Sequence, residues 1–233
     1  MSLWLKSLFC YNRLYMKLFT NQEKRFVGTA VLITCCLLFF AFFQQSSQLS
    51  SVLQGFIITL VFFLLLPLLY TRLVLGEPLG HLGFRMPNQP VVAFLWLLFA
   101  SAIGFFVCWG VVYFDPSVVE KIIFPVQVET SFVWFILYAL TLLPLVTLIY
   151  EVFFRGLVQM LWLSNTWKAV VFQWALFVVL LFLTDGITKT GAPLIASALM
   201  AGVVARKTDS LWYAFITSYL IAFLTDVLFL SLR

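Results

Sequence analysis

The sequence carries little charge: Lys, Arg, Asp and Glu make up 10% of its 233 residues, against about 25% in a typical soluble domain. Hydrophobic residues make up 64%, and the mean hydropathy is +1.08. So few charged groups cannot cover a surface that faces water, which excludes a soluble enzyme, a disordered chain and a secreted disulfide scaffold. The apolar runs are continuous rather than alternating, which argues against a membrane β-barrel. We expect an all-α, polytopic transmembrane helical bundle.

Histidine and cysteine are also scarce. The single histidine, His81, lies in a polar turn and is expected to face solvent or headgroups. One histidine cannot make a two-histidine site for zinc or for a catalytic water. The cysteines have no metal-ligand spacing and read as small packing residues; they are Cys10, Cys35, Cys36 and Cys108. With no Gly-rich phosphate loop either, we expect neither a cofactor nor a metal.

Seven continuous apolar runs predict about seven to eight helices in one domain covering residues 26–233. The runs cover residues 26–43, 52–75, 90–114, 131–163, 168–184, 191–205 and 211–230. The fourth run is too long for a simple span, so we expect it to tilt, to kink near Pro144 or to continue past the membrane. The sixth run is short and rich in Gly, Ala and Ser, which suits a tightly packed interior helix.

The N-terminal segment, residues 1–25, has apolar residues at roughly helical spacing, interrupted by Lys6, Arg13 and Lys17. This pattern lacks the continuous apolar core of a signal peptide. It predicts an amphipathic helix in the membrane interface, with a poorly ordered basic tail as the alternative.

Basic residues predict the orientation. If the N-terminus is cytoplasmic, 11 of the 14 Lys and Arg residues fall on that side; the exceptions are Lys121, Lys189 and Arg233. Because this asymmetry lies in short loops, it favours a cytoplasmic N-terminus. The net charge of +5 is thus explained by the membrane rather than by nucleic acid. The default location is a bacterial plasma membrane, with a thylakoid or other internal membrane as the alternative. The far-side loop 115–130 is either a linker or a contact for a partner.

The fourth run contains the clearest polar motif, Tyr-Glu-Val-Phe-Phe-Arg-Gly, beginning at Tyr150. Glu151 and Arg155 are four residues apart and therefore share a helix face, in the favourable order. Ionisable residues inside a membrane run suggest a functional site. The simpler interpretation is a structural ion pair that ties this helix to its neighbours.

The motif resembles the Glu-Glu-x-x-x-Arg signature of the CAAX prenyl protease and bacteriocin-processing (CPBP, or Abi) intramembrane endopeptidases. Glu151, Arg155 and Gly156 match, Phe154 takes the usual aromatic place, and Tyr150 stands where that family has its first glutamate. The resemblance implies a CPBP-like helical core over about residues 84–230.

Two further fragments extend the resemblance. The family's Phe-x-x-x-His aligns with Phe177, which places Leu181 at the histidine. Its Gly-Ser-Leu-Trp aligns with 209–212, which places Ser218 at the following histidine and Ala222 at the asparagine.

In that family the first glutamate is thought to activate water, while the histidines and asparagine hold the water and the oxyanion. The substitutions at Tyr150, Leu181, Ser218 and Ala222 remove these groups, and tyrosine is a poor base at neutral pH. The first hypothesis is therefore a degenerate family member that scaffolds, chaperones or regulates a membrane partner. The second is an active endopeptidase in which Glu151 is the base. The third is a small channel or transporter.

Three other polar residues lie in or beside apolar runs. Gln173 shares a helix face with Phe177 and is expected to form an interhelical hydrogen bond. Asp185 and Asp226 lie near far-side helix ends, where each is either hydrated or paired across the bundle.

Overall fold

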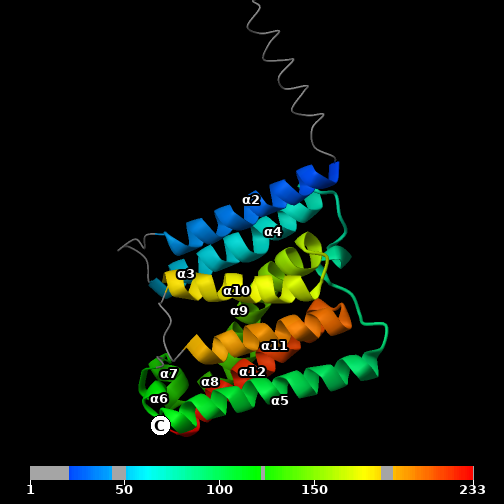
Figure 1. Cartoon of the computed structure of the whole chain (residues 1–233). Helices are drawn as coiled ribbons and strands as arrows, with labels where there is room; N and C mark the ends of the chain where they lie inside the picture. Colours follow the sequence, from blue (N-terminus) through cyan, green and yellow to red (C-terminus); the bar gives the residue numbers. More distant parts are fainter. Residues whose placement is uncertain (1–20, 44–50, 122–123, 185–190, 233) are drawn as a thin grey trace, which may run out of the picture.

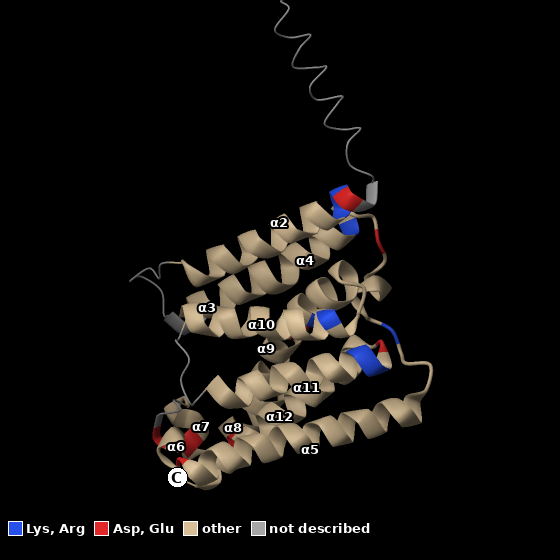
Figure 2. Cartoon of the chain, viewed as in Figure 1, with Lys and Arg blue, Asp and Glu red and all other residues tan. Residues whose placement is uncertain are grey.

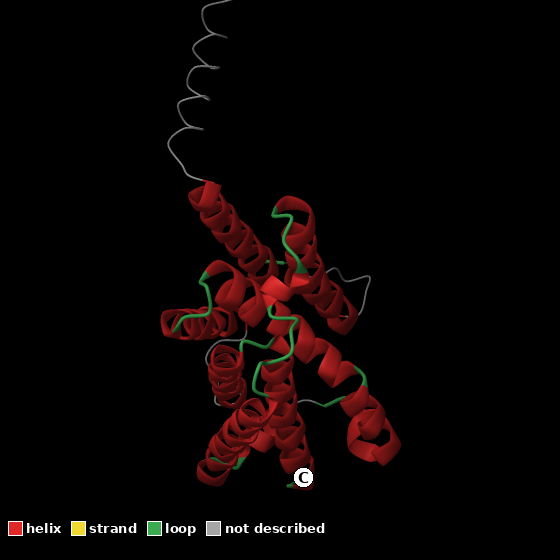
Figure 3. Cartoon of the chain, turned by 90° about the vertical axis from the view of Figure 1, so that its right-hand side faces the viewer, coloured by secondary structure: helices red, strands yellow, loops and turns green. Residues whose placement is uncertain are grey.

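The computed structural model describes residues 21–43, 51–121, 124–184 and 191–232 (Figure 1). Figure 3 shows that the regular structure in this described part is helical, without strands. By length and apolar composition, six helices of the described part can cross a membrane. The predicted all-α, polytopic bundle is thus confirmed. Residues 1–20 of the predicted interfacial segment lie outside the described residues, and so does Asp185.

The long helices follow the predicted apolar runs. They are α2 (Asn21–Ala41), the continuous helix α3 (Ser51–Leu60), η1 (Val61–Leu65), α4 (Leu66–Leu69) and η2 (Tyr70–Val74), then α5 (Pro90–Phe114), α8 (Phe132–Leu140), α9 (Leu142–Glu151), η4 (Val152–Trp162), α10 (Trp167–Thr184), α11 (Ala192–Thr208) and α12 (Leu211–Ser231). The short helices are η3 (Leu79–Leu82), α6 (Ser117–Lys121) and α7 (Val126–Thr130). Helix α2 begins five residues before the predicted start of the first run.

The fourth run is interrupted once. Helix α8 ends at Leu140, and α9 begins after Thr141. Pro144 lies three residues beyond the break, and a proline ring clashes with the carbonyl group four residues earlier, which here belongs to Leu140. The helix then continues without a gap from α9 into η4, an 11-residue π-helix.

The helix formed by α9 and η4 lies at the centre of the bundle. On one side it contacts α2, η1 and α10, and on the other it contacts α12, which packs with α5 and α11 (Figure 1). Nine consecutive residues of η4, from Val152 to Met160, are buried. Burial on all faces is the property of a core helix, so polar groups on this helix meet protein rather than lipid.

Helix α11 is the shortest of the seven long segments, at 17 residues. Its length of about 25 Å falls short of an apolar layer of about 30 Å. It packs against α5, α10 and α12, with Ala201 and Ala205 completely buried. Small residues let neighbouring backbones approach closely, which agrees with its predicted role as an interior helix.

The outer surface of the bundle is apolar, as membrane contact requires. Helix α5, for example, exposes large hydrophobic side chains along its length; among them are Phe94, Leu95, Leu98, Phe99, Phe106 and Val107. Most of the described Lys and Arg residues gather where α2 begins and α11 ends, at the right in Figure 2. We call this end of the bundle the basic end. Its helix termini meet headgroups and water on one side of the membrane.

Candidate functional site

Glu151 and Arg155 form a buried ion pair at the centre of the bundle. The distance from Arg155 Nη1 to Glu151 Oε1 is 3.3 Å, and each side chain is 2% exposed. Arg155 Nη2 also donates to the backbone carbonyl of Ala198 on α11 at 2.7 Å. The pair therefore connects the central helix to α11, and the two opposite charges offset each other in an almost fully buried position.

Ser218 on α12 donates from Oγ to the same carboxylate oxygen, Glu151 Oε1, at 2.7 Å. This oxygen is thus shared by the hydroxyl and the guanidinium group. Within the described part of the chain, Glu151 Oε2 and Arg155 Nε are buried and have no hydrogen-bond partner. A carboxylate normally accepts several hydrogen bonds, so the pair retains capacity for one more donor.

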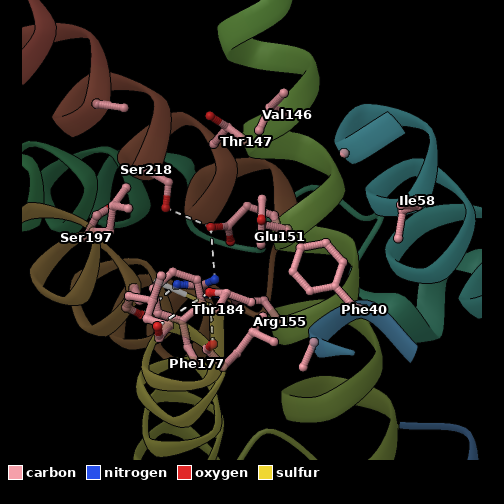
Figure 4. A pocket seen from close by; sticks show the side chains of 18 of the residues that line it. Phe40, Ile58, Val146, Thr147, Glu151, Arg155, Phe177, Thr184, Ser197 and Ser218 are labelled. Carbon is pink, nitrogen blue, oxygen red and sulfur yellow. Dashed lines mark hydrogen bonds and ion pairs between the residues drawn. The ribbon is translucent and has the colours of Figure 1, made fainter. Parts of the chain in front are cut away.

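A cavity of ≈ 560 Å³ lies beside the pair (Figure 4). It is lined by the six positions that align with the family's two glutamates, arginine, two histidines and asparagine; they are Tyr150, Glu151, Arg155, Leu181, Ser218 and Ala222. These positions come from α9, η4, α10 and α12 and span 73 positions of the numbering, from 150 to 222. Tertiary packing thus brings together the residues that the sequence motifs single out, around one space.

The cavity walls are mainly apolar. Ala41 and Gly55 contribute from the α2 and α3 ends that face each other, and Thr184 and Leu194 from the facing ends of α10 and α11. These helix ends lie opposite the basic end (Figures 1 and 2). The cavity therefore extends from Glu151 toward the end of the bundle that carries few Lys and Arg residues.

Aromatic side chains form the wall next to the ion pair. The ring of Tyr150 lies edge-on to Phe63 and Phe177, with centroids at 5.5 and 6.2 Å, and stacks on Phe154 at 6.3 Å. Such contacts hold the tyrosine ring in place. At the positions of the family's histidine and asparagine, Leu181 and Ala222 present apolar side chains that neither hold water nor donate a hydrogen bond.

Two buried glutamines extend the polar centre toward the basic end. Gln173 donates to the carbonyl of Ala198 at 3.3 Å, the expected interhelical hydrogen bond. Gln159 donates to the carbonyl of Gly202 at 3.0 Å and to Asn165 Oδ1 at 2.7 Å. A Cβ atom at Gly202 would lie 2.4 Å from Gln173 Nε2, which is a collision, and in tight contact with Gln159 Oε1 at 3.3 Å. The sequence reasoning missed Gln159, although it lies four residues after Arg155 and eight after Glu151 and so continues their stripe.

The other polar candidates lie away from the cavity. His81 is exposed and pairs with Glu77, which also accepts from Arg25 at 2.5 Å. The hydrogen bond from Arg25, reinforced by His81, lowers the pKa of Glu77. Asp226 accepts a hydrogen bond from Tyr138 at 3.1 Å, so it is paired across the bundle. Among the described residues, no group of three His, Cys, Asp or Glu side chains is arranged to hold a metal ion.

Searches against protein-family models, curated proteins and solved structures found no match to this chain. Fold and site together define the class: a multi-pass, all-α membrane protein with a buried ion pair beside an intramembrane cavity.

Proposed function

We propose that this chain is a catalytically degenerate protein of the CPBP type that holds a membrane partner as a scaffold, chaperone or regulator. The observation that supports this most directly is the cavity lined by Tyr150, Glu151, Arg155, Leu181, Ser218 and Ala222, the positions that align with the family's polar site residues. The ion pair remains there, while the groups expected to activate and hold water are replaced. The same fold can host unrelated functions, so the proposal rests on the residues of this site.

The site lacks the hydrogen-bond donors that peptide hydrolysis would need. In the second hypothesis Glu151 would act as the base, but its Oε1 is engaged by Ser218 and Arg155. Leu181 and Ala222 offer nothing to a developing oxyanion, and one lost oxyanion donor costs about 3–4 kcal/mol of barrier. The endopeptidase remains the second candidate because Glu151 lines the cavity and its Oε2 has no hydrogen-bond partner among the described residues.

The proposed occupant is an apolar segment of a membrane protein. Leu143, Val146, Ile58 and Leu180 face the space and offer dispersion contacts to a helix or extended segment. Lipid is the competing occupant, because the surrounding surface is apolar as well.

We further propose that the N-terminus and the basic end are cytoplasmic. The concentration of Lys and Arg at that end supports this through the positive-inside rule. The bacterial plasma membrane is the proposed location, with a thylakoid or other internal membrane as the alternative. In either case the cavity extends from Glu151 toward the opposite end of the bundle.

The occupancy test places a photo-cross-linking amino acid at Ile58, on the cavity wall, and at Leu98, on the exposed face of α5. We expect a discrete protein adduct in membranes from the Ile58 position and only diffuse lipid adducts from Leu98. Equal labelling at both positions would refute a cavity-bound protein partner.

The catalytic test compares wild type with Glu151→Gln in liposomes that contain prenylated and unmodified membrane peptides. We expect no cleavage by either protein. Turnover by wild type that disappears in Glu151→Gln would reject the binding role and establish the glutamate-dependent endopeptidase.

A further inference from the structure

Three helix ends converge on one lysine at the basic end. Lys207, in the last turn of α11, places its Nζ 5.0 Å from the ring centroid of Trp96 on α5 and 5.3 Å from that of Trp167 on α10. The guanidinium carbon of the neighbouring Arg206 lies 6.0 Å from the Trp167 ring. Cations at these distances are attracted to the indole faces. The lysine is therefore held between two aromatic rings while it remains exposed.

The positive charge of this cluster is not balanced by carboxylates of the described chain. The ion pairs among the described residues involve Arg25, His81, Arg85 and Arg155, and none involves Arg206 or Lys207. The acidic residue nearest in sequence, Asp209, is already paired with Arg85. Arg206 Nε is buried and has no hydrogen-bond partner among the described residues.

The surroundings of the cluster match the two parts of a phospholipid. Tryptophan favours the depth of the headgroups, where its apolar ring and its N–H group are both accommodated. Further along the same helices, toward the middle of the bundle, exposed apolar side chains follow, such as Phe99 on α5 and Val171 on α10. A headgroup at Lys207 would thus have its acyl chains beside an apolar protein surface.

We propose that Lys207 and Arg206, framed by Trp96 and Trp167, bind the phosphate headgroup of an anionic phospholipid. The cations attract the phosphate, and the two rings hold Lys207 in a position to meet it. The attraction of cations to the negative end of the α11 dipole explains basic residues in its last turn, but it does not explain two indoles from other helices around one of them. This site is independent of the cavity and of its proposed occupant.

The test measures how much phosphatidylglycerol the purified full chain retains in detergent, by native mass spectrometry, with phosphatidylcholine as the neutral lipid. We expect wild type to retain phosphatidylglycerol selectively. The double variant Arg206→Gln/Lys207→Gln should bind it about 25-fold more weakly, at about fivefold for each charge removed. Lys207→Arg should retain binding, which separates loss of charge from loss of folding.

Arg72→Gln is the matched control, because Arg72 is exposed at the same end but is not part of the aromatic cluster. We expect its retention of phosphatidylglycerol to stay within about twofold of wild type, since a single remote charge contributes little to a defined site. Equal losses in Arg72→Gln and in the double variant would overturn the proposal. Displacement of the lipid by soluble glycerol phosphate would also overturn it, since the site would then bind free phosphate.

Discussion

Removing one member of the central ion pair should destabilise the protein strongly. In Glu151→Ala, the Arg155 guanidinium, which is 2% exposed, keeps the Ala198 carbonyl as its hydrogen-bond partner. Leaving a buried charge uncompensated costs roughly 3–5 kcal/mol. For a chain of this size, that corresponds to a decrease of about 6–20 °C in Tm.

The assay is thermal unfolding in detergent, followed by tryptophan fluorescence and by monodispersity. The key control is the double variant Glu151→Leu/Arg155→Met, which removes both charges and keeps apolar volume. We expect it to recover most of the lost stability, because replacing a buried pair with packed apolar groups is often neutral or favourable. Its residual loss should be about 1–3 kcal/mol, from the unsatisfied Ser218 hydroxyl.

Two results would refute this reasoning. One is a Tm for Glu151→Ala within about 2 °C of wild type, which would mean that the pair contributes little. The other is a double variant less stable than either single variant, which would mean that the charges are not coupled. A stable Glu151→Ala that nevertheless loses a cellular activity would favour the catalytic interpretation.

The remaining predictions concern topology, packing and pH. Cysteines introduced at Asn88 and Ser117, which are exposed and flank α5 at opposite ends, should label from opposite sides in a cysteine-free background, with Ser117→Cys labelled from outside; same-side labelling would contradict the topology. Gly202→Val should lower Tm by several degrees, because its side chain collides with the buried Gln173 and crowds Gln159, whereas Gly110→Ala, with open space around it, should change Tm little; similar losses in both variants would show that close packing at Gly202 does not matter. The pKa of Glu77 is lowered in the folded protein. The ionised carboxylate therefore stabilises the fold fully above the ordinary pKa of a glutamate, and this stabilisation is lost as the pH falls through the lowered pKa. On acidification, amide hydrogen exchange at the start of α2 should therefore accelerate more in wild type than in Glu77→Gln. The same pH response in both proteins would show that the Arg25–Glu77 pair does not stabilise this end of α2.

Local chemistry made much of the fold predictable. Helix α5 has the bounds expected from its apolar run, 90–114, because a proline starts it and an aspartate ends it. The interruption before Pro144 was foreseeable for the same kind of reason, since a proline disturbs the preceding turn whatever its neighbours are. By contrast, α6 and α7 lie within the predicted loop 115–130. Helices of five residues have almost no intrinsic stability, so their sequence carried no signal.

The site, too, was predictable from the sequence only in part. That Glu151 and Arg155 share a helix face follows from their spacing alone. Their burial and their further partners do not, because Ser218 is 67 residues from Glu151, and Ala198 is 43 residues from Arg155. Such contacts depend on how α11 and α12 pack against the central helix. Sequence periodicity reports each helix's own faces, whereas the cavity exists only between helices, where small residues and close packing decide which side chains meet.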